Sequence, residues 1–229
     1  MNTVLVIAAH PDDEVLGCGG AIARHSHQGD AVHVLILAEG VTSRDGQRDR
    51  TQRTPELSAL ATAAEAAHRI LGSQSLTLQD FPDNRMDSCA LLDIVKPIER
   101  AIATHNPTLI YTHHSGDLNI DHRRIHEAVV TAARPLPDSG VQTLLFFEVP
   151  SSTEWQVPGA APPFLPNWFI DIATTLEQKL AALDAYASEM RPFPHARSRQ
   201  AVAALAHWRG ASAGMQAAEA FCLGRHRLF

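Results

Sequence analysis

Short apolar runs alternate with longer amphipathic stretches through the first two-thirds of the chain. The runs are rich in Val, Ile and Leu and are continuous rather than alternating, which is typical of strands buried on both faces. The predicted strands are TVLVIAA (3–9), AVHVLILA (31–38), SLTLQD (75–80), TLIYTHH (108–114) and VQTLLFFEVP (141–150).

Helical patterns separate these strands, and the first two of them end at Gly29 and Gly72. They are VLGCGGAIARHSHQG (15–29), TPELSALATAAEAAHRILG (54–72), CALLDIVKPIERAIATHN (89–106) and HRRIHEAVVTAAR (122–134). Pro97 is expected to kink the third of them. Alternating buried strands and helices predict a mostly parallel sheet covered on both faces. The fold class is therefore α/β, a Rossmann-like three-layer sandwich.

The pattern changes after Pro150. Residues 151–168 (SSTEWQVPGAAPPFLPNW) are rich in proline and predict a long loop or cap. Helical patterns follow at 174–190 and 198–221, so we expect a helical C-terminal extension. One domain over 1–229 is predicted, in which an α/β core precedes the cap and the C-terminal helices.

Composition narrows the functional classes. Hydrophobic residues make up 45% of the 229, charged residues 19%, and the formal net charge is −6 with scattered basic residues, which argues against a nucleic-acid partner. The N-terminus lacks the features of a secretory signal, and no apolar stretch reaches membrane-spanning length. The three cysteines show no C-x-x-C spacing. We expect a cytoplasmic protein without a membrane span; the proline-rich segment leaves room for a homo-oligomer.

Polar clusters follow each predicted strand. In open α/β sheets, ligands bind beyond the carboxyl ends of the strands. Acids and histidines occur at those ends: His10 to Glu14, Glu39, Asp80 to Asp87, His113 to His122, and Glu148. We expect them to share one site.

The glycines after the first strand do not form a nucleotide-binding loop. A dinucleotide fingerprint places a pyrophosphate at this turn, but here the turn carries Asp12, Asp13 and Glu14. Carboxylates would repel such a ligand, so the GCGG glycines are expected to allow close helix–sheet packing.

A metal ion would relieve this crowding of carboxylates. His10 and Asp13 lie three residues apart in a tight turn, and a hydrolytic zinc takes about three protein ligands plus a water. The histidine pair His122 and His126 resembles a zincin helix, but Arg123 stands where H-E-x-x-H requires glutamate. We therefore take His122 as the third ligand and His126 as a helix-surface residue.

Two motifs together resemble a known family. AAHPDDEVLGCGG followed by DLNIDHRRIHEA is similar to the PIG-L/LmbE family of zinc-dependent N-acetylglucosaminyl deacetylases, over roughly residues 3–134. RTPELSALATAA also resembles the family's R-x-x-E helix, and AEAF near the C-terminus is a weaker echo.

The resemblance implies a site and a reaction. His10, Asp13 and His122 match the ligands of one Zn²⁺ per chain, a position that other divalent metals can also take, and Asp12 matches the general base. The implied reaction removes acetyl from a small N-acetylated amino sugar or glycoside and yields acetate and free amine. Glu14 either takes part in the reaction directly or caps the start of the helix and supports the reacting groups.

One position departs from the family pattern. Many relatives carry a further histidine three residues before His122, where this chain has Asn119. His195 is the candidate replacement, and an exposed loop histidine is the alternative. Asp121 is expected to steady a ligand imidazole from behind.

Substrate contacts are less defined. Arg53 matches the R-x-x-E arginine and binds either a sugar group or the glutamate three residues later. Asp83 or Asp87 holds sugar hydroxyls or serves a turn. Trp155 and Trp168 either stack on a sugar ring or pack in the core or the cap.

Two other functions are alternatives. A metal-dependent amidase would use the same residues on a bulkier acyl or thiol conjugate of an amino sugar. A non-catalytic sugar binder belongs to another class, but it has no use for a base beside a metal-activated water.

Overall fold

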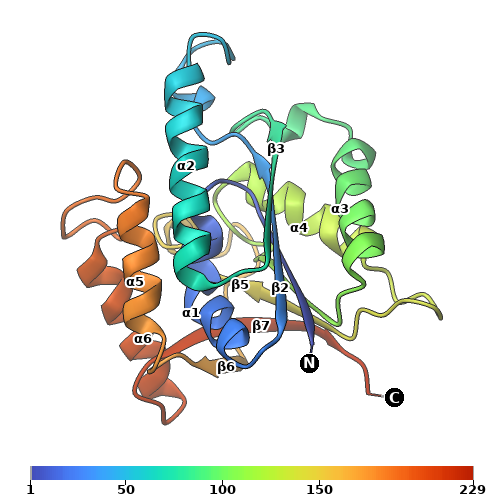
Figure 1. Ribbon diagram of the computed structural model, residues 1–229, viewed down its shortest axis with the longest axis vertical. Coiled ribbons are helices and arrows are strands. Elements are labelled where there is room, and N and C mark those ends of the chain that lie inside the picture. The colour runs from blue at the N-terminus through green and yellow to red at the C-terminus, as the bar shows by residue number, and fades with distance from the viewer. Residues whose placement is uncertain (1, 229) are drawn as a thin grey trace.

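A seven-stranded sheet organises residues 2–228, which are the residues described by this computed structural model (Figure 1). Its strand order is β3-β2-β1-β4-β5-β7-β6. The strands are β1 (Thr3–Ala8), β2 (Ala31–Ala38), β3 (Ser75–Phe81), β4 (Leu109–His113), β5 (Thr143–Phe147), β6 (Trp168–Asp171) and β7 (Ala218–His226). The first five are parallel, and β7 runs antiparallel to both β5 and β6. The predicted parallel sheet is confirmed.

Helices cover both faces of the sheet, as predicted. They are α1 (Asp13–His27), α2 (Thr54–Leu71), α3 (Leu91–His105), α4 (Ile120–Ala132), α5 (Leu176–Ala185) and α6 (Arg199–Ser212). Val4 and Val6 of β1 share a core with α1, α2, α5 and α6, whereas Leu5 and Ile7 share one with α3 and α4. Alternate residues of one buried strand therefore serve two layers. Pro97 lies inside α3, which continues to His105.

The C-terminal third differs from the prediction. The helix expected over 198–221 ends at Ser212, and Ala218–His226 forms β7. Phe221 pairs with Phe147 of β5, and its ring packs 5.1 Å from that of Tyr111. These tertiary contacts outweigh the helix propensity of an alanine-rich segment. β6 was also missed, because it lies in and beyond the proline-rich segment. The extension therefore contributes two helices and two strands.

Helix α1 packs unusually close to its neighbours. A Cβ on Gly17 would lie 2.4 Å from Cδ2 of Phe147, and one on Gly20 would lie 2.8 Å from the Ile172 side chain. No ordinary side chain tolerates such distances, so the interpretation of these glycines as packing residues is confirmed. α1 is also kinked at Cys18, whose φ and ψ are −148° and 24°.

The last strand supports the kinked helix. Both carboxylate oxygens of Glu219 accept hydrogen bonds from the backbone of α1 just after the kink, from Gly20 N at 2.9 Å and Ala21 N at 2.7 Å. Lys179 of α5 donates to the same carboxylate at 2.6 Å. Glu219 thus caps the second half of α1, where a kink leaves backbone donors without helical acceptors.

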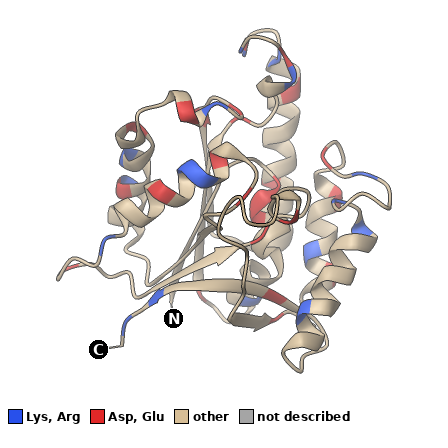
Figure 2. Cartoon of the chain, turned by 180° about the vertical axis from the view of Figure 1, so that it is seen from behind, with Lys and Arg blue, Asp and Glu red and all other residues tan. Residues whose placement is uncertain are grey.

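Charges are interspersed over the chain. Figure 2 shows Lys and Arg mixed with Asp and Glu along the helices and loops.

Within residues 2–228, no helix is both long and apolar enough to cross a membrane.

Candidate metal centre

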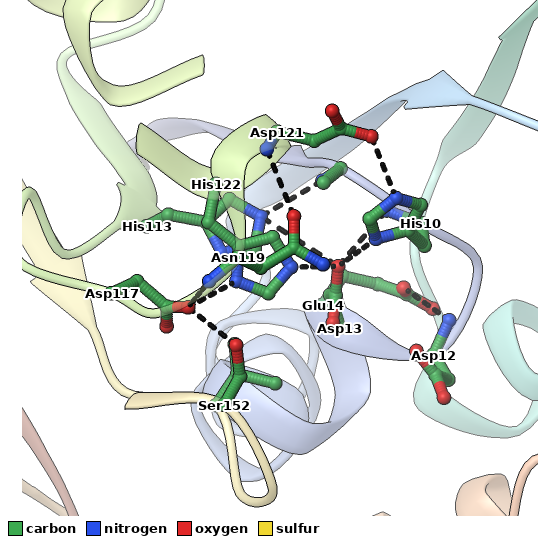
Figure 3. Close-up of polar contacts among 12 residues, drawn as sticks. His10, Asp12, Asp13, Glu14, His113, Asp117, Asn119, Asp121, His122 and Ser152 are labelled. Carbon is green, nitrogen blue, oxygen red and sulfur yellow. Dashed lines mark hydrogen bonds and ion pairs between the residues drawn. The ribbon is translucent and has the colours of Figure 1, made fainter. Parts of the chain in front are cut away.

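Three predicted ligands meet at the carboxyl end of the sheet (Figure 3). His10 and Asp13 come from the turn between β1 and α1, and His122 from the first turn of α4. Asp13 Oδ2 lies 3.1 Å from His10 Nδ1 and 3.0 Å from His122 Nε2. One nitrogen or oxygen from each residue falls within 4.8 Å of the others. The structure therefore brings together residues that are 112 positions apart in sequence (122 − 10).

The donor set suits a divalent cation. Two imidazoles and one carboxylate are the ligands of many catalytic zinc sites. Asp13 is fully buried, and its Oδ1 has no hydrogen-bond partner among the described residues, although buried polar atoms are normally paired. Burial disfavours the carboxylate, but His122 and His10 outweigh it and hold the pKa of Asp13 well below its usual value. The Asp13 side chain is therefore a carboxylate anion, whose charge a bound cation would neutralise.

Asp117 supports His122 from the opposite side. Its Oδ1 lies 3.1 Å from His122 Nδ1, the ring nitrogen that faces away from Asp13. Hydroxyls of Ser152 and Thr153 donate to the same carboxylate, the second at 2.5 Å. Burial lowers the pKa of His122, but the two carboxylates outweigh it and raise the value to about 9. Sequence analysis missed Asp117 because its loop position alone gives no sign of this contact.

Asp121 and Asp83 support His10 in the same way. His10 Nε2 lies 3.0 Å from Asp121 Oδ2 and 3.2 Å from Asp83 Oδ1. Backbone N–H groups of Asn84 and Met86 donate to Asp121, so this carboxylate is anchored before it meets the ring. Burial lowers the pKa of His10, but these carboxylates and Asp13 together raise it well above its usual value. Asp121 therefore contacts the imidazole of one ligand candidate.

Asp12 occupies a strained turn beside the three ligand candidates. Its φ is 121°, a region that residues other than glycine rarely adopt. Oδ2 pairs with Nη1 of Arg197 at 2.7 Å, and the Asp12 backbone N–H donates to Glu14. Burial raises the pKa of Asp12; Arg197 opposes this, but Asp13 and Glu14 add to it, and the pKa stays well above its usual value.

Arg197 is the second residue whose role the sequence did not reveal. Besides Asp12, its guanidinium contacts Ser151, with Nε donating to Oγ at 2.6 Å. Its backbone N–H donates to Nδ1 of His195 at 3.0 Å. The ring of His195 lies edge-on to Trp155, with the ring centres 5.6 Å apart. Arg197 therefore reaches Asp12, and Nδ1 of His195 is engaged within its own loop.

Glu14 is a structural link rather than a group directed at the ligands. Its side chain is fully buried. Oε2 accepts from Asp12 N at 3.0 Å, and Oε1 accepts from the Tyr186 hydroxyl at 2.7 Å and lies 3.2 Å from Nε2 of His68. The turn that carries Asp12 is thus tied to α2 and to the end of α5.

Asn119 is the N-cap of α4. Its Oδ1 accepts from the backbone N–H of Asp121 at 2.8 Å, and its Nδ2 donates to Asn84 Oδ1 at 2.8 Å. Both ends of the amide are therefore occupied, and the position where relatives carry a further histidine serves helix capping here.

The remaining candidates lie outside this cluster of contacts. Arg53 pairs with Asp45 through two nitrogens, at 2.7 and 2.6 Å, and with Glu56 at 2.9 Å. Its guanidinium is engaged by carboxylates at the start of α2. His126 is half-buried rather than on the helix surface, and its Nδ1 donates to the backbone carbonyl of His113.

Comparisons with known proteins identify a family and several relatives. A family model described as PIG-L: GlcNAc-PI de-N-acetylase matches residues 5–133, more than half of the chain. The uncharacterized deacetylase YaiS of Escherichia coli K12 is 29% identical over 191 residues, covering 81% of this chain and 90% of that protein. The 4-oxalmesaconate hydratase of Pseudomonas putida is also 29% identical, over 210 residues, covering 82% and 76%. Among solved structures, the conserved protein TT1542 of Thermus thermophilus is 25% identical with a TM-score of 0.76, covering 100% and 97%.

Proposed function

Because this chain belongs to the PIG-L family, we propose that it is a metal-dependent amide hydrolase acting on an N-acetylated amino sugar or glycoside. The products are acetate and the free amine. The observation that carries the proposal is the convergence of His10, Asp13 and His122 beside the buried carboxylate of Asp12.

The three convergent residues would hold one divalent ion, with zinc the first candidate. When bound, such an ion polarises a carbonyl oxygen and lowers the pKa of a coordinated water towards 7. The protein's part is to keep the ligands oriented: Asp121 and Asp83 hold His10, and Asp117 holds His122. Orientation of this kind raises ligand basicity and fixes the tautomer of the imidazole.

We assign the proton transfers to Asp12. It takes a proton from the water as the water oxygen bonds to the acetamide carbon, and returns it to the nitrogen when the carbon–nitrogen bond breaks. Arg197 fixes Oδ2 of this carboxylate and leaves Oδ1 for the proton. Arg197 cannot act as the base in place of Asp12. Burial lowers the pKa of its guanidinium, but Asp12 and other nearby carboxylates outweigh burial and raise this already high pKa further.

A hydratase is the second candidate. The relative named 4-oxalmesaconate hydratase shares as much identity with this chain as the deacetylase does. Adding water to a carbon–carbon double bond also needs a positioned acid–base group and electrophilic assistance, so the same residues suit it. An amidase acting on a bulkier acyl conjugate remains the closest variant of the main proposal.

The test is a panel of N-acetylated sugars with free acetate as the readout. The zinc-loaded protein should release acetate from at least one of them, lose that activity on chelation and regain it when zinc is restored. Absence of acetate release from the whole panel, together with hydration of an unsaturated dicarboxylic acid, would establish the hydratase instead.

A further inference from the structure

One short segment, residues 151–155, contacts groups on both sides of the metal centre. Ser152 and Thr153 donate to Asp117, which lies against His122. The preceding residue, Ser151, accepts a hydrogen bond from Arg197, which pairs with Asp12. Residues 151–155 are therefore held in place relative to the reacting groups.

Trp155 ends this segment and is exposed. Trp155 is the last residue of the 3-10 helix η3 (Thr153–Trp155), and 52% of its surface is exposed to water. Packing within the core therefore does not account for it. The indole makes an edge contact with His195, whose Nδ1 accepts from the backbone of Arg197. A chain of contacts thus runs from Asp12 through Arg197 and His195 to the indole.

Leaving an indole in water is unfavourable, because tryptophan carries one of the largest apolar surfaces of any side chain. Two other segments also expose apolar side chains. Phe193 is 58% exposed and lies in the loop that carries His195; Leu118 is 46% exposed and follows Asp117. Each of the three segments that contact the catalytic groups therefore carries an exposed apolar side chain.

We propose that Trp155 is a specificity-determining residue that binds the sugar ring beyond the reacting acetamide. This inference rests on the proposed function. Asp12, Asp13 and His122 are each at most 1% exposed, so a sugar ring cannot lie among them and must bind outside this cluster. One face of a hexose ring carries C–H groups while its hydroxyls lie around the edge. A flat indole covers such a face, and the N–H of the indole can meet a hydroxyl.

The test compares Michaelis constants for N-acetylglucosamine and its β-1,4-linked dimer. Because both sugars carry the ring next to the acetamide, Trp155→Ala should raise KM for each about tenfold with kcat changed less than twofold, and Trp155→Phe should recover most of the loss. Trp208→Ala is the matched control: Trp208 is 67% exposed on α6 and should leave both constants unchanged. Zinc content should be the same in all four proteins.

A binding measurement separates this inference from the proposed function. Calorimetric titration of the dimer into zinc-loaded Asp12→Asn should give about tenfold weaker binding when Trp155→Ala is added. Equal affinity with and without the indole would overturn the inference, as would a fall in kcat at constant KM. Absence of acetate release by the unmodified protein would instead count against the proposed function.

Discussion

Asp117 Oδ1 lies 3.1 Å from Nδ1 of His122, and the same carboxylate accepts hydrogen bonds from Ser152 and Thr153. The loop that follows β5 therefore helps to set the orientation of His122, one of the ligand candidates. This arrangement links metal affinity to residues that would not touch the metal.

Replacing Asp117 with asparagine should weaken metal binding about 10- to 100-fold, because the imidazole of His122 loses the partner that fixes its orientation. Competition with a chromophoric chelator measures the affinity. Asp87→Asn is the control, since Asp87 is exposed and belongs to the neighbouring 3-10 helix η2 (Met86–Ser88). Equal affinity in the two variants would show that Asp117 does not position His122.

Asp12→Asn should retain zinc and the fold but lose acetate release by about 10²- to 10⁴-fold, because an amide cannot take the proton of the attacking water. Asparagine is also tolerated at positive φ better than most residues, so the strained turn is preserved. Acetate production and zinc content are measured together, with Asp138→Asn as an exposed control. Full activity of Asp12→Asn would require another base.

Lys179→Met should lower the free energy of unfolding by about 3 kcal/mol. Lys179 and Glu219 are each 4% exposed in their side chains and pair at 2.6 Å, so the change leaves a buried carboxylate without its cation. Lys96→Met removes an exposed pair with Glu99 and should cost less than about 1 kcal/mol. Chemical denaturation compares them; equal losses would contradict the buried-pair argument.

Gly17→Ala should destabilise the protein by about 1–3 kcal/mol, since the added methyl meets the Phe147 ring. Gly46→Ala should have little effect, because a Cβ there meets nothing within 4 Å. Thermal and denaturant unfolding provide the measurement. The cost of Gly17→Ala should shrink in a Phe147→Leu background, and an unchanged cost there would place the strain elsewhere.

The strand–helix alternation could be read from the sequence because buried parallel strands are continuous apolar runs. β7 could not, since Ala218 and Ala220 favour a helix locally, and only pairing with β5 and β6 makes Phe221 extended. Local propensity fails where pairing with a distant strand decides the conformation.

The metal-ligand candidates could be predicted for a similar reason. His10 and Asp13 share one turn, and His122 begins a helix after a strand end, so their convergence follows from the topology of a parallel sheet. Asp117 and Arg197 act through loops whose paths depend on tertiary packing, and neither spacing nor residue type identifies them. His195 has the right chemistry, but its neighbour Arg197 makes the contact with Asp12.

Glu219 lies 199 residues after Gly20, whose backbone it caps. At ribosomal speeds of about 5–20 residues per second, the second half of α1 waits roughly 10–40 seconds for that carboxylate to be synthesised. The contact between α1 and β7 therefore cannot support the kinked helix until β7 has been synthesised.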